Sequence, residues 1–397
     1  MAKPEIRLKG FKGEWEKMSF SEMVNRVATS GDTKTMPGVE FEDIISGEGV
    51  LNKDINNKKI NKVGKCFEPG DVLFGKLRPY LKNILLADFK GVAIGDFWVL
   101  RPNKINSNLL YMLVSSNNFM KVANISSGSK MPRADWNLVF NSHFYIPKEK
   151  DEQKAISDYF KSLDSMILGV TKKISALKQM KQACLVSMFP QAGETTPRVR
   201  FKGFKGEWQE KRLCDCLEIS TERNFDNKYG KEDVLSVSDD FGVMNQIELL
   251  GRSYAGKSVS NYGILKTGEI VYTKSPLKSK PFGIVKQNTG KTGIVSVLYA
   301  VYIAKEGTAA DYIHYYFDPD WRLNNYLRPL VNKGAKNTMN ISDEMALTGY
   351  IMIPKDISEQ QKIASYFCSL DKQISLQESR LEKLKQIKSA SLDKMFV

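Results

Sequence analysis

The sequence predicts an α+β protein in which two mixed α/β domains are joined by two long helices, paired as an antiparallel coiled coil about an internal pseudo-twofold axis. Three observations predict this fold: a duplication of the sequence, strand and turn patterns in the body of each copy, and a heptad pattern at the end of each copy. A repeat of about 200 residues is too long for a solenoid unit, so we expect each copy to be a domain with an attached helix.

The duplication is clearest at the ends of the copies. A segment that opens with Ile146-Pro147-Lys148 and closes with Met188-Phe189 returns 207 residues later, from Ile353-Pro354-Lys355 to Met395-Phe396. The openings repeat at an offset of 193, since residues 9–15 and 202–208 both read KGFKGEW. We therefore expect a domain over residues 1–145, a helix over 146–189, a linker over 190–199, a domain over 200–352 and a helix over 353–397.

The body of each copy shows a shared scaffold. Residues 70–76, GDVLFGK, align with residues 268–274, GEIVYTK, and in both a turn pair leads into a β-branched and aromatic run that is typical of a strand. A basic loop with a proline follows each run. Residues 128–130 align in the same way with residues 334–336. The second body is 14 residues longer, the difference between the two offsets, so we expect common strands and divergent loops.

Each copy ends in a heptad pattern without an internal proline, which predicts a long helix. The apolar positions are Ile156, Phe160, Leu163, Ile167, Val170, Ile174 and Leu177 in the first copy, and Ile363, Phe367, Leu370, Ile374, Leu381 and Leu384 in the second, where Gln377 is the polar exception. Each helix has about 36 residues and is on the order of 55 Å long. Two equal stripes on one chain most simply bury each other in antiparallel order; the alternative is that each packs on its own domain.

Composition favours a polyanionic partner and a reducing compartment. The net charge is +14, and both halves are basic, with 30 basic against 21 acidic residues up to residue 199 and 29 against 24 after it. The five cysteines have no framework spacing, and neither histidine lies near the Cys214 and Cys216 pair, so we expect no metal site and no cofactor. The longest apolar run, around Val295–Ala304, is too short to span a membrane, and a cytoplasmic location is expected.

Two sequence patterns suggest catalysis but lack the context that it requires. Residues 251–258, GRSYAGKS, fit the Walker A pattern, yet no helix pattern follows them on which a phosphate could be bound. Asp318-Pro319-Asp320-Trp321 resembles the Asp-Pro-Pro-aromatic loop of amino-methyltransferases, but its third position is acidic and no glycine-rich cofactor loop accompanies it. We therefore expect a chain that is not an enzyme.

The divergent loops carry the positive signals for DNA. Basic and hydroxyl side chains follow the aligned strand in both copies, and such side chains neutralise phosphates, donate to phosphate oxygens or reach guanine edges. A solvated, lysine-rich surface loop is the alternative for any one of them. The candidates for DNA contact are Lys76, Arg78, Tyr80, Lys82, Lys130, Arg133, Lys274, Ser275, Lys278, Lys280, Lys336 and Asn337.

With these motifs the chain resembles the specificity subunits of Type I restriction-modification enzymes. The resemblance rests on the duplicated Ile-Pro-Lys, Glu-Gln, Tyr-Phe and Leu-Asp helix start, on the two KGFKGEW openings, and on residues 69–80, PGDVLFGKLRPY, and it covers essentially the whole chain. It implies two target recognition domains that read a bipartite site in double-stranded DNA and carry no chemistry. It also implies partners: two modification subunits that bind S-adenosylmethionine and methylate adenine, and restriction subunits that use ATP.

Two other classes of protein remain open at this stage. A P-loop nucleotide hydrolase would require ATP binding that depends on Lys257. A stand-alone DNA-binding regulator would bind its sequence tightly without partner subunits.

Overall fold

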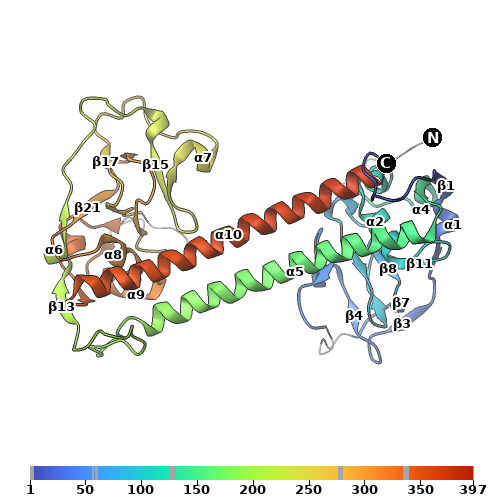
Figure 1. Ribbon diagram of the computed structural model, residues 1–397, viewed down its shortest axis with the longest axis horizontal. Helices are drawn as coiled ribbons and strands as arrows, with labels where there is room; N and C mark the ends of the chain where they lie inside the picture. Colours follow the sequence, from blue (N-terminus) through green and yellow to red (C-terminus); the bar gives the residue numbers. More distant parts are fainter. Residues whose placement is uncertain are drawn as a thin grey trace. The chain divides into compact units, whose positions relative to one another are not determined.

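The computed structural model describes residues 4–55, 58, 61–125, 131–275, 280–333 and 339–396. It divides into two compact units, one comprising Met1–Lys172 with Glu378–Val397 and the other comprising Lys173–Gln377. We call them unit one and unit two. Each contains one body and part of each of the two long helices, α5 (Lys150–Ser187) and α10 (Ile357–Met395), which Figure 1 labels.

The body of unit one is built on two four-stranded sheets. The antiparallel sheet has the order β2 (Val24–Arg26), β11 (Phe97–Pro102), β8 (Val72–Gly75) and β9 (Ile84–Leu86). The other sheet has the order β3 (Ser30–Asp32), β7 (Val63–Phe67), β10 (Gly91–Ala93) and β4 (Gly38–Val39), and its last pair is parallel. Two further antiparallel sheets have two strands each. One pairs β1 (Trp15–Ser19) with β12 (His143–Pro147), and the other pairs β5 (Ile44–Ile45) with β6 (Val50–Leu51).

The body of unit two repeats the antiparallel sheet with the same order of equivalent strands. This sheet contains β14 (Leu217–Ile219), β21 (Ala300–Ala304), β18 (Ile270–Tyr272) and β19 (Val285–Gln287). β13 (Gln209–Arg212) pairs with β24 (Tyr350–Ile353) as β1 pairs with β12. The rest has diverged into separate pairs, namely β15 (Leu235–Ser238) with β16 (Gly242–Asn245), β17 (Gly263–Leu265) with β20 (Gly293–Val295), and β22 (Asn332–Lys333) with β23 (Met339–Asn340).

The strand predicted at the aligned GDVLFGK and GEIVYTK segments is confirmed in both bodies. It is β8 in unit one and β18 in unit two, and every residue of both strands is buried. A glycine in the left-handed region precedes each strand, Gly70 at φ 91° and Gly268 at φ 92°, where a side chain would be strained. Shared strands with divergent loops are therefore what the duplication produced.

Short helices lie between the strands in both bodies. In unit one they are α1 (Phe20–Met23), α2 (Ser107–Ser115), α3 (Asn117–Ala123) and α4 (Trp136–Asn141); in unit two they are α6 (Leu213–Cys216), α7 (Gln246–Leu250), α8 (Ala310–Tyr316) and α9 (Asp320–Leu327). Side-chain oxygens of Asn106, Ser116 and Asp135 cap α2, α3 and α4 by accepting backbone N–H donors. The Phe74 and Phe119 rings meet edge to face at 5.3 Å, which joins α3 to β8 in one apolar core.

The predicted heptad positions of α5 and α10 are buried or partly buried. Ile156, Phe160, Leu163, Val170, Ile174 and Leu177 are buried on α5, and Ile363, Phe367, Leu370 and Ile374 on α10, while Ile167, Leu381 and Leu384 are partly buried. Gln377 is buried as well. Its Oε1 has no hydrogen-bond partner among the described residues, as expected for a polar side chain in an apolar stripe.

Within each unit the two helix segments run antiparallel. In unit one the Tyr159 hydroxyl lies 3.0 Å from Ser391 Oγ, and Lys388 Nζ lies 2.6 Å from Asp164 Oδ1. In unit two the matching pairs are Tyr366 with Cys184 at 3.4 Å, and Lys181 with Asp371 at 2.8 Å. Residue numbers decrease along one helix as those of the partner residues increase along the other, which is the antiparallel order. Each residue of a pair in unit two lies 207 positions from its counterpart in unit one, which is the offset of the repeat.

The repeated openings are tied to the starts of the long helices by a buried ion pair. Arg7 donates to both carboxylate oxygens of Glu152 at 2.6 Å, and Arg200 donates to both oxygens of Glu359 at 2.7 and 2.8 Å. Both carboxylates are almost fully buried. Bidentate pairing of this kind fixes orientation as well as position, so the duplicated sequence encodes a duplicated attachment.

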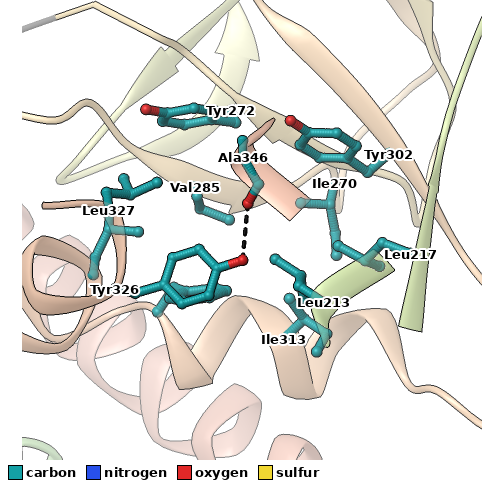
Figure 2. A pocket seen from close by; sticks show the side chains of 12 residues that line it. Leu213, Leu217, Ile270, Tyr272, Val285, Tyr302, Ile313, Tyr326, Leu327 and Ala346 are labelled. Atoms are coloured by element: carbon teal, nitrogen blue, oxygen red, sulfur yellow. Dashed lines mark hydrogen bonds between the residues drawn. The ribbon is translucent and has the colours of Figure 1, made fainter. Parts of the chain in front are cut away.

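A small cavity lies inside unit two between its sheet and helices (Figure 2). Leu213, Ile270, Val285 and Leu327 are among its mainly apolar lining residues. The Tyr326 hydroxyl donates to the Ala346 carbonyl oxygen at 2.8 Å and so is satisfied within the protein. The space holds about one water molecule, which makes it a packing gap of the core and not a ligand site.

Candidate nucleic-acid interface

In unit one the candidate residues gather on the loop that joins β8 to β9. Backbone bonds hold this loop against a second segment: Arg78 N donates to Pro132 O at 2.8 Å, and Ala134 N donates to Lys76 O at 2.8 Å. Leu77 and Arg133 also form an isolated β-bridge. The structure therefore brings Lys76, Arg78 and Arg133 together, although Arg133 lies more than 50 residues away in the chain.

The exposed groups of this surface are basic and aromatic. Arg78 is exposed, Tyr80 is 56% exposed, and the Arg133 side chain is 52% exposed. Asp96 lies beneath them, with Oδ1 3.3 Å from Lys76 Nζ and Oδ2 3.1 Å from Arg133. This carboxylate thus orients two cations from different segments of the chain.

Backbone strain is concentrated in the candidate loops. Four described residues other than glycine have a positive φ, and three of them are candidates: Arg78 at 49°, Lys82 at 51° and Lys274 at 47°. Such a conformation costs about 1 kcal/mol or more for a residue with a Cβ, and it persists where surrounding contacts enforce it. The strained positions thus lie in the equivalent loops of both bodies.

Lys82 differs from its neighbours because its side chain points into unit one. Its Nζ donates to the Ser115 carbonyl oxygen at 3.1 Å and to Asn117 Oδ1 at 3.2 Å. Burial lowers the pKa of the Lys82 ammonium, while the Asp393 carboxylate opposes that shift. Its ammonium is thus engaged at the junction of α2 and α3.

In unit two the equivalent loop joins β18 to β19. Lys274 pairs with Asp343, whose backbone carbonyl accepts a hydrogen bond from the Tyr302 hydroxyl at 3.1 Å, and Ser275 beside it is partly buried. Lys280 is only 6% exposed and forms ion pairs with Asp320 and, at 3.2 Å, with Asp239. The loop therefore presents Lys274 and Ser275 more openly than Lys280.

The remaining candidates, Lys130, Lys278, Lys336 and Asn337, lie outside the described residues.

The Asp-Pro-Asp-Trp segment is covered only in its first half: Asp318 is partly buried and Pro319 is buried, whereas Asp320 and Trp321 are exposed. Asp318 accepts from Lys286 Nζ at 3.0 Å and pairs with Lys181 Nζ of α5 at 3.0 Å. Burial of the Asp318 carboxylate would raise its pKa, but the two lysine charges outweigh burial and hold the pKa well below its usual range. An ionised carboxylate locked between two ammonium groups stabilises the fold and is not available to hold a target amine.

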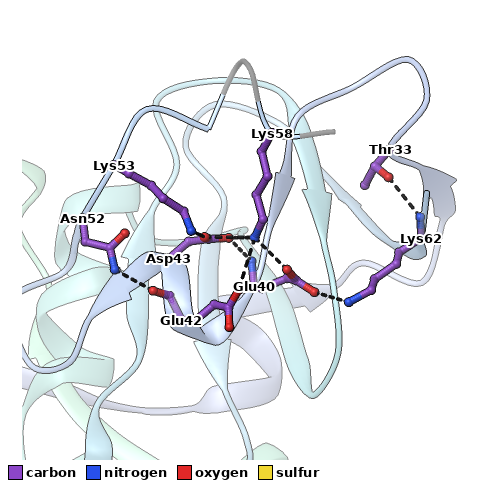
Figure 3. A network of polar contacts seen from close by, with 8 residues as sticks. All are labelled: Thr33, Glu40, Glu42, Asp43, Asn52, Lys53, Lys58 and Lys62. Carbon is purple, nitrogen blue, oxygen red and sulfur yellow. Dashed lines mark hydrogen bonds and ion pairs between the residues drawn. The ribbon is translucent and has the colours of Figure 1, made fainter. Parts of the chain in front are cut away.

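A second ion-pair network in unit one fastens the segment before β5 (Figure 3). The fully buried Asp43 carboxylate pairs with Lys58 at 2.7 Å and with Lys53 at 2.8 Å, and Glu40 pairs with Lys58 and Lys62 at 2.6 Å each. Burial would raise the pKa of Asp43, but the hydrogen bonds from Lys53 and Lys58 lower it further than burial raises it. These lysines are thus structural, although they contribute to the positive charge of the first half.

The structure does not build a nucleotide site at the Walker-like residues 251–258. Gly251 ends the short helix α7, and the next element after Ser258 is the strand β17. No helix begins between Ser258 and that strand, so no helix N-terminus is presented to a phosphate. Within the described part of the chain, no group of three or more His, Cys, Asp or Glu side chains is placed to hold a metal ion, and no helix has the length and apolar character to cross a membrane.

Sequence reasoning missed the acidic partners that organise the loops. Asp96 and Asp343 carry no motif, and Asp320 was considered only as part of the Asp-Pro-Asp-Trp segment. All three lie far along the chain from the lysines that they bind. The duplicated Arg7 and Glu152 positions did carry a signal, because both recur in the second copy as Arg200 and Glu359. A recurring pair of opposite charges is a usable indication of contact.

Comparison with known proteins assigns this architecture. Residues 205–386 match the family model for the Type I restriction modification DNA specificity domain. None of the curated proteins matches the chain. The S subunit of a Type-I restriction-modification system from M. genitalium has a TM-score of 0.60 at 12% identity, covering 100% of this chain and 99% of that one. A chain from a solved type I R-M system, described in terms of complex assembly and conformational transition, has a TM-score of 0.53 at 17% identity, covering 97% of this chain and 98% of that one.

The family match shows that residues 205–386 are similar to a DNA specificity domain. The likeness to the solved structures shows that the fold of S subunits extends over nearly the whole chain. The matched residues belong to the Type I restriction modification DNA specificity family, and the resemblance inferred from the duplicated motifs is confirmed.

Proposed function

We propose that the whole chain is the non-catalytic recognition subunit of a Type I restriction-modification complex, and that each body reads one half of a bipartite site in double-stranded DNA. The observation that carries the proposal is the repeated loop after β8 and β18. In both bodies an equivalent strand is followed by a loop with a basic residue in the left-handed backbone conformation, Arg78 in unit one and Lys274 in unit two. The other contacts of the two loops differ. A common scaffold with different loops suits two half-sites of different sequence.

We assign recognition to residues 1–145 and 200–352, spacing to the helices over 146–189 and 353–397, and a linker role to residues 190–199. The helices are proposed to pair over their whole length as one antiparallel coiled coil about a pseudo-twofold axis. The matched contacts at Tyr159 and Tyr366 and at Asp164 and Asp371 support this arrangement, because each unit contains the same antiparallel pairs.

The partners proposed for the chain are two modification subunits and the restriction subunits of the same system. The modification subunits would dock on the paired helices and supply adenine methylation, and the restriction subunits would supply ATP-driven cleavage. The absence of a nucleotide-binding turn at residues 251–258 supports a chain that leaves both reactions to its partners. Since the proposed ligand of the chain is DNA, we place the chain in the cytoplasm.

Exchange of one body tests this function. Residues 17–145 are replaced by the equivalent body of a relative, the complex is assembled with its modification subunits in a host, and methylated sites are mapped by sequencing. One half of the methylated motif should change while the other half and the spacer length stay the same. A change in both halves, or in neither, would contradict the assignment of one half-site to each body.

The chain alone provides the second test. Purified without partners, it should neither transfer a methyl group to DNA nor hydrolyse ATP. Lys257→Ala should leave DNA binding unchanged, and neither the wild-type chain nor this variant should bind ATP. ATP binding by the isolated chain that disappears in this variant would favour the P-loop hydrolase instead.

A further inference from the structure

Lys82 and Lys280 occupy the same place in the two bodies. Lys82 lies eight residues beyond Phe74 of β8, and Lys280 lies eight residues beyond Tyr272 of β18. Phe74 pairs with Ile84 as Tyr272 pairs with Val285, so the two loops leave equivalent strands at equivalent points. Both lysines belong to the loops that we assign to DNA contact.

Both side chains turn away from solvent toward the same structural feature. Lys82 Nζ donates to Oδ1 of Asn117, the first residue of α3, and Lys280 pairs with the carboxylate of Asp320, the first residue of α9. Each of these helices follows directly after the helix that packs on the antiparallel sheet. Because the contact recurs at equivalent positions of two diverged bodies, we do not regard it as accidental.

The helices that receive these lysines are fixed by the core. Phe119 of α3 packs against Phe74 at 5.3 Å and against Phe20 at 5.3 Å, and Leu323 and Leu327 of α9 are buried with Tyr272 in the core of unit two. The lysines therefore connect a strained loop to a rigid helix. In unit two a second carboxylate, Asp239, reinforces the connection at 3.2 Å.

We propose that Lys82 and Lys280 are positioning residues, which hold their loops to the first turn of α3 and α9 so that other side chains of the loops meet the bases. This inference rests on the proposed function in DNA recognition and assigns these two lysines a role other than contact with DNA. The acceptor is the amide of Asn117 in unit one and the carboxylate of Asp320 in unit two, so an amide is sufficient to hold the lysine.

The salt dependence of binding separates the two roles. A lysine that neutralises a phosphate contributes about 0.9 to the slope of log affinity against log salt concentration. A positioning residue contributes nothing to that slope, but its loss impairs discrimination between correct and incorrect bases. The ratio of the dissociation constants for scrambled and correct half-sites measures that discrimination.

The test uses the full chain assembled with its modification subunits, and DNA duplexes that carry the motif methylated by the wild-type assembly. Control duplexes have one half-site scrambled. In Lys280→Met and in Asp320→Ala, we expect the ratio for the half-site of unit two to fall about tenfold, with the salt slope and the other half-site unchanged. The double variant should fall no further than Lys280→Met alone, because the loss of Lys280 already removes the contact with Asp320.

Conservative substitutions provide the matched controls. Asp320→Asn reproduces the acceptor of unit one and should keep the ratio within about twofold of wild type. Lys82→Met and Asn117→Ala should impair only the half-site of unit one. Thermal unfolding of each variant shows whether its body is folded, and hydrogen exchange of residues 280–284 should rise in Lys280→Met but not in Asp320→Asn.

Three results would overturn the inference. A salt slope lower by about 0.9 in Lys280→Met would make this lysine a phosphate contact. A higher ratio in Asp320→Ala would mean that the carboxylate competes with DNA for the lysine. If the Lys280→Met variant is folded and its ratio is unchanged, the contact contributes only to stability. If the wild-type assembly itself fails to distinguish the correct from the scrambled duplex, the proposed function fails instead.

Discussion

The indole of Trp15 meets the ring of Phe396 edge to face, with the ring centroids 6.1 Å apart, although the two residues lie at opposite ends of the chain. In unit two Trp208 meets Phe189 in the same way at 6.2 Å. Each body is thus closed by the end of a long helix that begins in the other copy of the repeat. Duplication of the sequence has produced a reciprocal exchange of helix ends.

Removal of either phenylalanine should destabilise the body that it closes. Phe396 and Phe189 are both almost fully buried, and Phe→Ala substitutions at such sites cost about 3 to 5 kcal/mol. Phe396→Ala should lower the unfolding transition of unit one, and Phe189→Ala that of unit two, as measured by calorimetry. Ile387→Ala, at a half-exposed position of α10, is the control and should change stability by less than about 0.5 kcal/mol.

The arginine attachments of the two openings should be equally sensitive. Arg7→Ala leaves the buried Glu152 carboxylate without its partner, which costs about 3 kcal/mol in comparable cases. Arg7→Lys should recover only part of this, because an ammonium group lacks the planar guanidinium fork that donates two parallel hydrogen bonds to a carboxylate. Chemical denaturation of these variants and of Arg200→Ala measures the effect. Equal stability of Arg7→Lys and wild type would show that charge alone is required.

Acidification should weaken unit two through His314. Burial, aided by the Lys286 charge, lowers the pKa of this imidazole to about 3, and its Nδ1 has no hydrogen-bond partner among the described residues. The pKa in the folded state lies below the ordinary value near 6.5. The stabilising contribution is therefore complete above pH 6.5 and is lost as the pH falls from there toward 3.

Calorimetry between neutral pH and pH 5 checks this expectation. The melting temperature of unit two should fall over that range, with a loss of up to about 1 kcal/mol per pH unit. His314→Gln should flatten the dependence, whereas substitution of the exposed His143 should leave it unchanged. A wild-type profile that does not vary above pH 5 would contradict a buried neutral imidazole.

Arg78 offers a direct test of base reading. Loss of its side chain should cost about 1 to 3 kcal/mol in DNA binding, and should relax one base position if the guanidinium makes a bidentate base contact. If it binds phosphate, all sequences should weaken alike. Because Arg78 has a φ of 49°, Arg78→Gly removes the side chain without adding backbone strain and is preferable to Arg78→Ala. Quantitative binding to a set of single-base variants distinguishes the outcomes.

The long helices should set the spacing of the half-sites if they pair over their whole length. One heptad inserted after Leu177 and one after Leu384 preserve the heptad phase and lengthen the pair by about 10 Å, or roughly three base-pair rises. The spacer of the methylated motif should lengthen, or binding to the original site should fail, while both half-sites keep their sequence.

An insertion that breaks the heptad phase is the control for spacing. Four added residues rotate each apolar stripe away from its partner and should destabilise the assembly. If the heptad insertions change neither spacing nor affinity, the helices do not set the distance, and their stripe serves the partner subunits instead.

The sequence by itself determined the parts that repeat. The heptads of α5 and α10, and the strand at residues 72–75 with its counterpart at 270–272, leave a periodic or duplicated trace, because local hydrophobic patterns dictate them. Arg7 and Glu152 also recur as Arg200 and Glu359, but only the structure showed that they pair. The absence of a phosphate-binding helix after Ser258 followed from the same local reasoning.

Only the tertiary structure decided what the loop cations do. In the sequence, Lys76, Lys82 and Lys280 are all lysines of a basic loop. In the structure, Lys76 lies near the surface beside Asp96, whereas Lys82 and Lys280 contact the first residues of α3 and α9. Asp96, Asn117 and Asp320, the partners of these three lysines, lie between 20 and 40 residues away in the chain, on segments brought near by sheet and helix packing. Side-chain direction depends on where a carboxylate or amide is placed by the fold, and no local pattern in the sequence records that position.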